Sequence, residues 1–547
     1  MKIWVVSNEC SGLSEAGGVK DVTYSLCENF SQKNDVTLFI PLYGCTNLSC
    51  VKFTGDKELE GKVSLCGQNI SVKFSKALLI STGIKIVFIK HQAYSEKKGV
   101  YVYTQEEEKE NPMHARGMGH EDVHFLDSLL CKAVALYGTI IGKNQEPDII
   151  HCQDASTAMT PAFVELLKPD YFNKTKCVVT IHNAGPAYHH EFSDLNEAIW
   201  FTELPWNWLT DSMNGQRVEP YLISSRFACL TTVSSFYAEE ISKPQENDYT
   251  DGLSRIFSER KIDVKGITNG IDYFQYAPEY PEISLLPFSM NPFCGKLEGK
   301  LKNRDFFLSL CKNESLNKED SGNDQELKSE KNQNEEKADF SFSQKEKYLS
   351  NFLRFGFLEK AKKAVYFVFH GRLVWQKGIH VLCQAISELL QSNNFLRFVI
   401  VGQGDPQIEK KLEELADKYS GKFVFFEGYN HYLPRLAVSQ ADFSLIPSSF
   451  EPCCLEDFIS KLFGTLPLAH ATGGLKKIID GETGFLYSPN TKESISSCIL
   501  KAAELKTKEP ETIKNMIVWA SNYVRTVYSW EYVTEKYIKL FRLLKKL

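Results

Sequence analysis

Short apolar runs separated by longer helical stretches recur along most of this chain, and this alternation is what most restricts its fold. After a first run at residues 3–6, further runs rich in branched and aromatic side chains occupy residues 36–40, 84–89, 148–151, 177–181 and 264–268. A second series occupies residues 365–370, 398–401, 423–426, 443–446 and 466–469. Alternating strands and helices indicate parallel sheets built from strand–helix–strand units. Because 547 residues are too many for one hydrophobic core, the two series predict two doubly wound, Rossmann-like α/β domains.

A segment of different composition separates the two series. Half of residues 312–337 are charged, none is aromatic, and Leu316 and Leu327 are the only large aliphatic side chains. Such a segment buries too little apolar area to offset the entropy lost on ordering. We therefore expect a first domain at residues 1–280, a charged, flexible insertion or linker at 281–355, and a second domain at 356–527. The insertion is interpreted either as a docking segment for a partner or as a tolerated surface insertion, and the second interpretation is favoured.

Charge and cysteine content exclude several classes of protein. Lys and Arg total 63 against 69 Asp and Glu, and the net charge of −6 is spread along the chain, which gives no basic face for nucleic acid. The N-terminus enters the first apolar run without the features of a signal peptide, and no apolar run reaches membrane-spanning length. The 15 cysteines are scattered and lack the paired ligands of a zinc site. We therefore expect reduced thiols in a cytoplasmic protein, with no membrane contact, no metal and no other cofactor.

Polar residues that follow the predicted strands of the first domain are candidates for function, because open α/β sheets bind ligands beyond the carboxyl ends of their strands. Gly17 and Gly18 lie between a strand and a helix, where backbone N–H groups can approach a phosphate closely, although plain loop geometry is the alternative. The clusters at residues 151–154 and 180–183 end two neighbouring strands and contain Asp154 and His182. These side chains could hold sugar hydroxyls or stabilise positive charge, whereas a histidine at a strand end is often structural. Asn269, in an Asn-Gly-Ile-Asp sequence, is by itself typical of an ordinary turn.

The second domain offers cations and a carboxylate after its strands. Arg372 and Lys377 follow one strand, and a guanidinium with an ammonium suits a diphosphate. Two fixed cations could stabilise a departing diphosphate without a metal, whereas solvated surface charges are the alternative. Glu451 follows another strand and precedes a helix N-terminus, where it could act on a sugar or merely cap the helix.

Taken together, these segments resemble the bacterial glycogen synthase and plant starch synthase family. The resemblance covers residues 1 to about 280 and about 350 to the end, and its motifs agree in order and spacing. They are found at residues 17–18, 151–154, 180–183, 231–234, 269–272, 372–378, 427–429, 451–455 and 464–475. Members of this family have the GT-B fold, with two Rossmann-like domains facing across a cleft, and are retaining glucosyltransferases that need no metal. The resemblance also implies that a C-terminal helix at residues 528–547 returns to the first domain.

The resemblance implies transfer of glucose from ADP-glucose, or from UDP-glucose, to the non-reducing end of an α-1,4-glucan. Catalytic roles would fall on Glu451 near the reacting centre, on His182 beside the transferred sugar, and on the diphosphate-binding cations Arg372 and Lys377. Donor binding would involve Gly17, Gly18, Asp154, Asn269, Tyr429, Cys453, Cys454, Leu455, Thr472 and Gly473. Within that set, Asp154 and Asn269 would line the sugar and acceptor region, Tyr429 would stack on the base, and the backbone of residues 453–455 would hold glucose hydroxyls.

Three positions depart from the family pattern. Glu15 replaces the lysine of the glycine loop, a second family lysine in the helix before Thr231 is replaced around Ser224, and Cys454 replaces the glycine after the motif cysteine. The first change places a negative charge where a phosphate usually meets a positive one, which leaves the choice between ADP-glucose and UDP-glucose open. A GT-B glycosyltransferase with another donor or acceptor, and a non-catalytic glucan-binding relative, are therefore kept as alternatives to an active glucan synthase.

Overall fold

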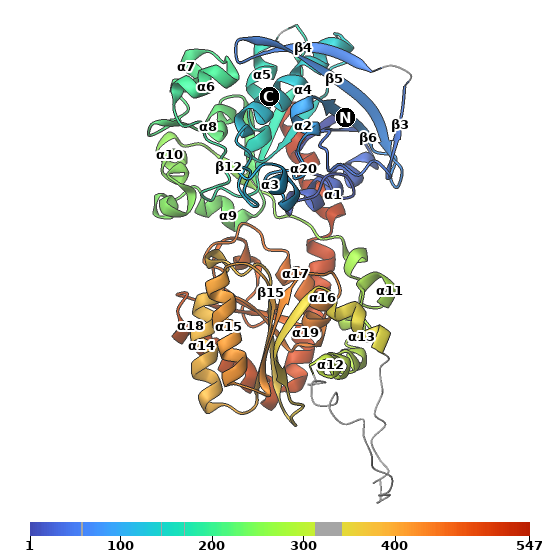
Figure 1. Cartoon of the computed structure of the whole chain (residues 1–547), viewed down its shortest axis with the longest axis vertical. Coiled ribbons are helices and arrows are strands. Elements are labelled where there is room, and N and C mark those ends of the chain that lie inside the picture. Colours follow the sequence, from blue (N-terminus) through green and yellow to red (C-terminus); the bar gives the residue numbers. More distant parts are fainter. Residues whose placement is uncertain (56–57, 144, 169, 312–341, 547) are drawn as a thin grey trace, which may run out of the picture. The chain divides into compact units, whose positions relative to one another are not determined.

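The chain divides into two compact units. The computed structural model describes residues 1–55, 58–143, 145–168, 170–311 and 342–546, so the charged segment at 312–337 lies outside the described residues. Unit 1 consists of Met1–Gly270 together with Tyr528–Leu547, and unit 2 consists of Ile271–Val527 (Figure 1).

A ten-stranded sheet forms the centre of unit 1. The strand order is β12-β11-β8-β7-β1-β2-β6-β5-β3, with β4 paired to β5. The strands are β1 (Lys2–Val6), β2 (Asp35–Pro41), β3 (Val51–Phe53), β4 (Leu59–Leu65), β5 (Gln68–Leu79), β6 (Lys85–Lys90), β7 (Ile149–Gln153), β8 (Lys176–Ile181), β11 (Ala228–Thr232) and β12 (Val264–Gly266). Pairs from β12 to β6 are parallel, whereas β5 pairs antiparallel with β3, β4 and β6. This antiparallel extension was not predicted, because β4 alternates exposed and buried residues and lacks a continuous apolar run.

Helices follow most of these strands. The helices of unit 1 are α1 (Val19–Ser31), α2 (Gln92–Ser95), α3 (Gln105–Glu110), α4 (Val123–Ile141), α5 (Thr160–Leu166), α6 (Leu195–Thr202), α7 (Trp206–Thr210), α8 (Pro220–Ser225), α9 (Ser235–Glu240), α10 (Leu253–Arg260) and α20 (Trp530–Leu544). A short antiparallel pair, β9 (Met213–Asn214) with β10 (Arg217–Val218), precedes α8. Among the described residues, α4 alone is long and apolar enough to cross a membrane, but 61% of its most apolar window is buried inside the unit. Since α4 packs on β4 and α5, it serves as a core helix.

The C-terminal helix α20 completes the core of unit 1. Its buried face includes Tyr537 and Phe541, spaced by one helical turn. The ring of Phe541 lies 5.6 Å from that of Phe30 on α1 and 5.6 Å from that of His151 on β7. Residues at the end of the chain thus cover the first helix and a central strand of the sheet.

Unit 2 is built around a seven-stranded sheet. The order is β13-β16-β15-β14-β17-β18-β19, and all neighbours are parallel except the antiparallel pair of β13 and β16. The strands are β13 (Phe352–Leu358), β14 (Val365–His370), β15 (Leu396–Gly402), β16 (Lys422–Gly428), β17 (Phe443–Ile446), β18 (Leu466–His470) and β19 (Phe485–Tyr487). The helices are α11 (Pro281–Ser284), α12 (Glu298–Leu310), α13 (Phe342–Leu349), α14 (Ile379–Ser392), α15 (Pro406–Lys418), α16 (Leu433–Gln440), α17 (Glu456–Leu462), α18 (Lys492–Lys508) and α19 (Pro510–Val527).

The structure differs from the expected linker at residues 281–355. On either side of the segment that is not described, this stretch contains α11, α12, α13 and β13, all within unit 2. The buried Lys300 of α12 donates hydrogen bonds to the Ser439 carbonyl and the Thr465 hydroxyl, both at 2.8 Å. The buried residues of α12 combine polar side chains, Lys300 and Asn303, with apolar ones near its end, such as Phe306. This mixed pattern has no regular apolar spacing, so the sequence did not reveal that α12 is part of the fold.

Strand order reverses once in each sheet, and these reversals define where a ligand can bind. In unit 1 the chain builds outward from β1 toward β6 and then returns through β7 to the other side of β1. In unit 2 it builds from β14 toward β16 and returns through β17 on the other side of β14. Loops leave the sheet in opposite directions at such a reversal, which opens a crevice at the carboxyl ends of the two strands. The loops after β1, β7, β14 and β17 are therefore the expected sites of chemistry.

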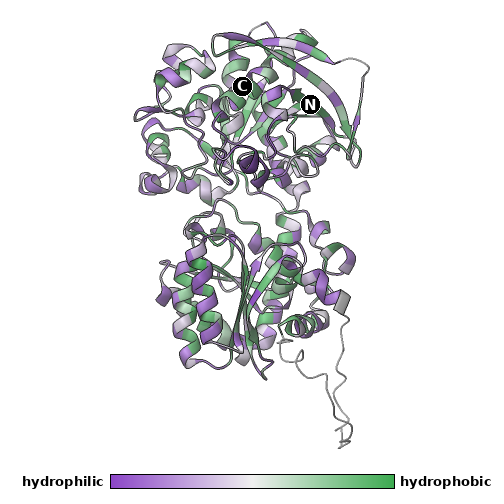
Figure 2. Ribbon diagram, in the orientation of Figure 1, coloured by the Kyte–Doolittle hydropathy of each residue, from purple (hydrophilic) through white to green (hydrophobic). Residues whose placement is uncertain are grey.

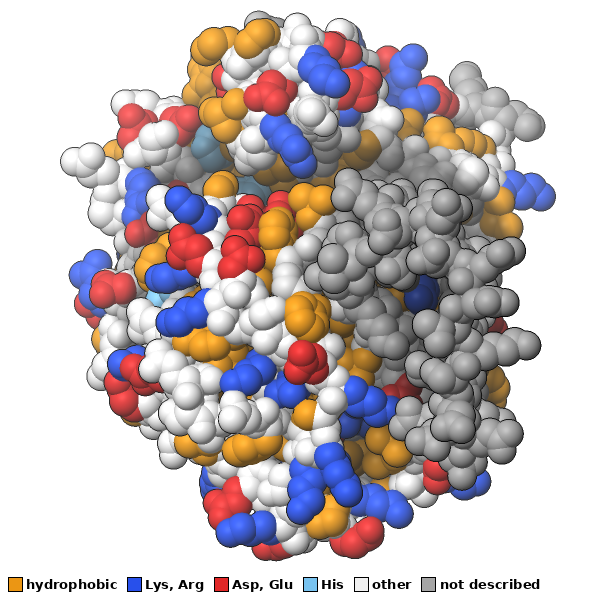
Figure 3. Space-filling model, turned by 60° about the horizontal axis from the view of Figure 1, so that its bottom comes forward, with side chains coloured by type: hydrophobic (Ala, Val, Ile, Leu, Met, Phe, Trp, Pro, Cys, Tyr) orange, Lys and Arg blue, Asp and Glu red, His pale blue; other side chains and the backbone are white. Residues whose placement is uncertain are grey.

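Apolar side chains concentrate in the strands of each unit, and charges of both signs lie outside them. In Figure 2 the central strands of unit 2 are mainly hydrophobic, whereas α14 and α15 present both kinds of residue around their circumference. The buried positions of α14 include Leu382, Ile386 and Leu389, which recur at three- and four-residue intervals. On the face drawn in Figure 3, Lys and Arg side chains lie among Asp and Glu side chains. Among the described side chains of this face, charges of both signs are therefore interspersed.

Replacing Phe541 by Ala should destabilise unit 1. The ring is fully buried, and truncation of such a side chain leaves a cavity that costs about 3–5 kcal/mol of unfolding free energy. Urea unfolding of the purified full chain would measure the loss. The matched control is Leu543→Ala on the same helix, where the side chain is 54% exposed and a change within about 0.5 kcal/mol is expected. Equal stabilities of the two variants would show that α20 is not part of the cooperative core.

Candidate active site

The site residues predicted from the sequence belong to both units. In unit 2, Lys377 ends the short helix η5 (Trp375–Lys377) after β14, and Glu451 lies in the loop after β17. The Lys377 Nζ lies 2.6 Å from the Glu451 Oε2, which also accepts a hydrogen bond from the Ser448 hydroxyl at 3.2 Å. The strand reversal thus brings together two predicted residues that are far apart in the sequence.

The surroundings of Lys377 keep its side chain protonated. Burial by itself would lower the pKa of the Lys377 ammonium, but the Glu451 carboxylate, the nearby Cys454 and the hydrogen bond to Glu451 together raise it. Side-chain exposure is 22% for Lys377 and 10% for Glu451. A protonated, partly enclosed ammonium next to a carboxylate is suited to bind an anionic group that approaches from the solvent side.

Arg372 differs from Lys377 in having no partner. It is exposed, and its side chain makes no hydrogen bond or ion pair with any residue that the structure describes. The preceding His370, at the end of β14, lies 2.8 Å from the Glu456 carboxylate. Because its side chain has no partner among the described residues, the Arg372 guanidinium is available for a phosphate.

The loop at residues 453–455 rests on a buried group of charges that sequence analysis did not identify. The fully buried Asp457 pairs with Lys461 at 2.9 Å and with Lys477 at 2.8 Å. The Lys477 Nζ also donates hydrogen bonds to the carbonyl oxygens of Cys453 and Cys454. Two ammonium groups against one carboxylate leave excess positive charge beneath the loop, which precedes the N-terminus of α17. The four-residue spacing of Asp457 and Lys461 is typical of an ion pair on a helix, so this pair could have been predicted from the sequence. No pattern in the sequence indicated that Lys477 joins them.

Glycine is needed at position 474 so that the loop containing it can pack against the loop at residues 453–455. A Cβ atom at Gly474 would lie 2.5 Å from the Cys453 Cα, and the Gly474 N–H donates to the Glu451 carbonyl at 2.8 Å. The predicted Thr472 donates through its hydroxyl to the Ser449 carbonyl at 3.3 Å, and Gly473 begins the short helix η6 (Gly473–Lys477). Thr472 and Gly473 are therefore brought next to the loop that carries Glu451, while Leu455 precedes α17 as its N-cap.

Tyr429 lies at a different strand of the same sheet. It follows β16, which is separated from β14 by β15. The residue is 60% exposed, and its hydroxyl lies 3.4 Å from the His431 Nδ1. An exposed aromatic face of this kind is available for stacking.

In unit 1, Asp154 and His182 are brought together at the carboxyl ends of β7 and β8. The His182 backbone N–H donates to the Asp154 Oδ1 at 3.2 Å, and the Tyr221 hydroxyl donates to the same oxygen. The His182 Nε2 lies 2.8 Å from the Gln153 Oε1. Burial lowers the pKa of His182, against the opposing effect of Asp154. The imidazole of His182 is thus held neutral and oriented by groups on β7.

His151 belongs to the core and not to the polar cluster in which the sequence placed it. The side chain is fully buried, its Nε2 lies 2.7 Å from the Thr180 hydroxyl, and its ring packs on Tyr537 and Phe541 of α20. Alternate residues of a strand face opposite sides of the sheet, so His151 and Cys152 cannot both point to the same face. The structural interpretation of this histidine is therefore the correct one.

Asn269 is buried and keeps an unused acceptor. Its backbone N–H donates to the Val233 carbonyl at 3.1 Å, but no hydrogen bond reaches its buried Oδ1 from any described residue. A Cβ at the adjacent Gly270 would lie 2.8 Å from the Trp530 ring, so glycine is required there for α20 to pack. The Asn-Gly pair thus combines a packing constraint with an acceptor that a ligand hydroxyl could use.

The glycine turn after β1 already holds a carboxylate of the chain itself. The buried Glu9 accepts hydrogen bonds through its Oε2 from the Ala16 N–H at 2.8 Å and the Gly17 N–H at 2.6 Å. Burial raises the pKa of Glu9, although these amide bonds oppose the shift. Sequence analysis did not identify Glu9, and its presence limits phosphate binding at this turn to the groups that remain, such as the N–H of Gly18.

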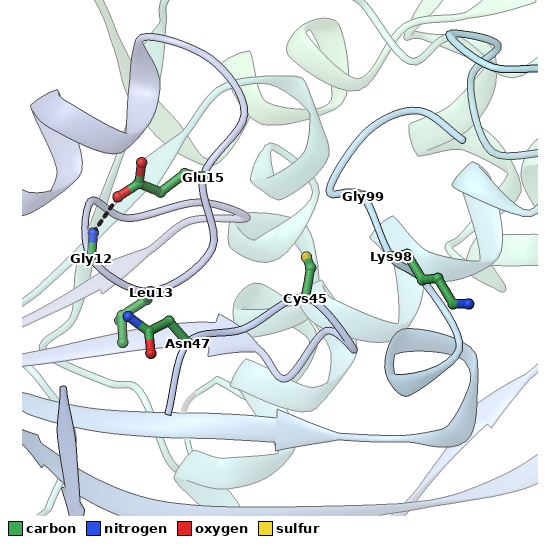
Figure 4. A pocket seen from close by; sticks show the side chains of 7 residues that line it. All are labelled: Gly12, Leu13, Glu15, Cys45, Asn47, Lys98 and Gly99. Atoms are coloured by element: carbon green, nitrogen blue, oxygen red, sulfur yellow. Dashed lines mark hydrogen bonds between the residues drawn. The ribbon is translucent and has the colours of Figure 1, made fainter. Parts of the chain in front are cut away.

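Glu15 contacts neighbouring groups of its own loop and the first turn of α1. Its Oε1 accepts a hydrogen bond from the Gly12 N–H at 2.6 Å, and Lys20 lies 3.7 Å from its Oε2. Figure 4 shows Glu15 on one side of a cavity of about 250 Å³ and Lys98 on the other. The cavity is lined by Gly12, Leu13, Glu15, Cys45, Asn47, Lys98 and Gly99. Since Lys20 pairs with Glu15 and with Asp21, it does not supply the unpaired cation that the replaced lysine would have given.

Unit 2 carries a cation paired with a carboxylate at its strand reversal, and unit 1 carries a neutral histidine directly after β8. Two doubly wound units of this kind have the GT-B fold of glycosyltransferases. Two family models match the chain, a starch synthase catalytic domain at residues 2–259 and a glycosyl transferases group 1 domain at residues 351–518.

Relatives match along nearly the whole length. The glycogen synthase of Thermodesulfovibrio yellowstonii is 27% identical over 99% of this chain and 97% of its own length. That of Flavobacterium johnsoniae is 26% identical over 100% of this chain and 99% of its own. The catalytic domain of starch synthase IV from Arabidopsis thaliana, solved bound to ADP and acarbose, has the same fold, with a TM-score of 0.75 at 21% identity over 100% of this chain and 99% of that chain. The chain belongs to the bacterial glycogen synthase and starch synthase family.

Stability should fall in acid because of His151. Burial lowers the pKa of this imidazole from 6.5 to about 3, so between these pH values the unfolded chain binds a proton that the folded chain rejects. One such proton lowers the unfolding free energy by about 1.4 kcal/mol for each pH unit below 6.5. Urea unfolding at several pH values between 6.5 and 4 would measure the unfolding free energy. In His151→Gln, the slope of this free energy against pH should be smaller than in wild type by about this amount. Equal slopes for variant and wild type would contradict a neutral core histidine.

Proposed function

We propose that this chain transfers glucose from ADP-glucose to the non-reducing end of an α-1,4-glucan, with retention of configuration. The observation that carries the proposal is the contact of Lys377 with Glu451 at the strand reversal of unit 2, beside an unpartnered Arg372. Membership of the glycogen and starch synthase family supports glucan synthesis. The Arabidopsis starch synthase, which was solved with ADP and acarbose, supports the choice of ADP-glucose.

Unit 2 supplies the groups that a departing nucleoside diphosphate requires. The guanidinium of Arg372 and the ammonium of Lys377 would bind its phosphates, and fixed cations stabilise the charge that develops as the sugar–phosphate bond breaks. The loop at residues 453–455 would hold glucose hydroxyls with its N–H groups, since its carbonyl groups are engaged by Lys477. Glu451 would fix the position of the transferred glucose, and the exposed Tyr429 ring would stack on the base.

Unit 1 supplies polar groups suited to sugar hydroxyls. The neutral His182 would donate or accept a hydrogen bond beside the reacting sugar without adding charge. Asp154 and the unpaired Oδ1 of Asn269 would accept hydrogen bonds from hydroxyl groups. These assignments give unit 1 the role of positioning sugar and acceptor.

We propose that the transfer itself needs neither a metal nor an organic cofactor. The two cations already provide the charge that a metal would bring to the diphosphate. Glu456 is held by His370, so it does not form with Glu451 the carboxylate pair of a glycosidase. Attack by the acceptor hydroxyl on the face from which the diphosphate leaves fits this arrangement. No disulfide joins the cysteines of the described residues, which supports a cytoplasmic location.

A second candidate is a GT-B glycosyltransferase that uses another donor or acceptor. It is favoured by Glu15, whose carboxylate occupies the glycine loop in place of the family's lysine, and by Glu9, which occupies two N–H groups of the turn. Both reduce the positive potential available to a donor phosphate. A panel of sugar nucleotides would separate this candidate from the first.

Glucose incorporation into glycogen from labelled ADP-glucose, and separately from UDP-glucose, tests the proposal directly. Wild type should incorporate from ADP-glucose at the higher kcat/KM. Glu451→Gln should reduce kcat on the order of 100-fold or more, the scale of losing a preorganised electrostatic contact. Glu456→Gln is the matched control and should retain activity within a few-fold. Incorporation from neither donor would reject the proposal, and glycogen binding without turnover would favour a non-catalytic relative.

Truncation of Lys377 tests the diphosphate role. Lys377→Ala removes a charged hydrogen bond, so kcat/KM for the donor should fall by the equivalent of about 1.5–3 kcal/mol. Product inhibition by the free nucleoside diphosphate should weaken in parallel, because both depend on the same cation. Steady-state kinetics with varied donor at fixed glycogen would measure both. Unchanged constants would remove Lys377 from the donor site.

A further inference from the structure

A buried group of three potential metal ligands lies in unit 1, outside the predicted active site. His189 and Glu191 belong to the segment between β8 and α6, and Glu219 caps the N-terminus of α8. The His189 Nδ1 lies 2.7 Å from the Glu219 Oε2 and 3.4 Å from the Glu191 Oε1. One atom from each of these side chains lies within 4.8 Å of the others. Ligand atoms around a tetrahedral Zn²⁺ are separated by about 3.3 Å, given metal–ligand distances near 2 Å, so small adjustments would admit an ion.

Each of the three side chains is held in place by a partner on its outer side. The His189 Nε2 lies 2.7 Å from the Ala184 carbonyl, which can only accept a hydrogen bond, so Nε2 carries the proton. The Glu219 Oε1 accepts from the Tyr221 N–H at 3.0 Å. The Glu191 Oε2 is paired with Arg217 at 2.7 Å. Outer partners of this kind orient metal ligands in known sites, and here they point Nδ1 and two carboxylate oxygens at one spot.

One of these oxygens has no hydrogen-bond partner. The side chain of Glu191 is 7% exposed, and its Oε1 accepts no hydrogen bond from the described residues. Buried carboxylate oxygens are costly when unsatisfied. An unsatisfied oxygen that faces a histidine nitrogen and a second carboxylate is the arrangement expected where an ion is to be bound.

Charge in the group also favours a cation. Glu191, Glu219 and Asp251 carry three negative charges, and Arg217, which is paired with Glu191 and Asp251, carries one positive charge. The group therefore carries an excess of negative charge, which a divalent ion would offset. Access is provided on the side of Arg217, whose side chain is 42% exposed.

We propose that His189, Glu191 and Glu219 bind a divalent transition metal ion, for which one imidazole and two carboxylates favour Zn²⁺. This site departs from the sequence-based prediction of a protein without a metal. It lies wholly within unit 1 and is independent of the proposed transfer reaction.

The ion would cross-link two segments of unit 1 close to the residues proposed to position the acceptor. It would join the segment after His182 to the start of α8, two elements already linked by backbone hydrogen bonds between Phe192 and Val218 at 3.0 Å. Tyr221, two residues after Glu219, donates its hydroxyl to Asp154, which in turn accepts from the His182 N–H. Binding would therefore order the loop that positions His182.

The test is binding of Zn²⁺ to the chelator-stripped full chain under reducing conditions. Competition with a chromophoric chelator should show one tight site in wild type. In Glu191→Gln and His189→Gln the affinity of that site should fall on the order of 10–100-fold or more. The unfolding temperature of wild type should rise with added Zn²⁺ and that of Glu191→Gln should not, because a ligand that binds only the folded state stabilises it. His114→Gln, a histidine of unit 1 that stacks on Tyr103, is the matched control and should bind as wild type does.

Cysteine binding is the competing explanation, and Co²⁺ distinguishes it. Substituted Co²⁺ should give d–d bands without a thiolate charge-transfer band. A thiolate band, equal affinity in wild type and Glu191→Gln, or no tight binding at all would overturn the proposal. If His189→Gln does not fold, the conservative Glu191→Gln variant still decides the outcome.

Discussion

The reversal of strand order beside β14 is the constraint on which the candidate active site of unit 2 depends. Only at that point do loops from two adjacent parallel strands leave the sheet in opposite directions. Lys377 and Glu451 occupy these two loops, and their 2.6 Å contact spans 74 residues of sequence. Without the crossover that places β17 on the far side of β14, an ammonium and a carboxylate at these positions would be ordinary surface charges.

Buried charge supports this geometry from beneath. Asp457, Lys461 and Lys477 are almost fully excluded from solvent, and Lys477 holds the carbonyl groups of the 453–454 turn. Cys454 adopts a φ of 64°, a backbone conformation that glycine adopts without cost. The replacement of the family's glycine by Cys454 is therefore accommodated by strain that the surrounding hydrogen bonds offset. The loop is held rigid enough to present its N–H groups in one orientation.

The glycine turn of unit 1 shows how a motif can serve a different partner from the one its sequence suggests. Two glycines before a helix are suited to phosphate, but Glu9 occupies the N–H groups of Ala16 and Gly17. A Cβ at Gly17 would lie 3.1 Å from the Glu9 carboxylate, so the glycine is also needed for the internal contact. His151 is a second example, because it belongs to a polar cluster in the sequence but packs against α20 in the structure. In both cases the decisive neighbour is distant in the chain.

The sequence alone determined the two doubly wound units, because the periodicity and composition of strands and helices are local properties. It also located the candidate site residues at strand ends, namely Glu451, Arg372, Lys377, Asp154 and His182. It could not show the antiparallel β3–β5 extension, the folded part of residues 281–311, or the roles of Glu9, Lys477 and Glu219 as partners. Those depend on which residues meet across the sheet, and pairing between distant segments leaves no periodic trace in the chain. Tertiary structure alone decided which polar residues meet at the strand ends and which, like His151, satisfy the core.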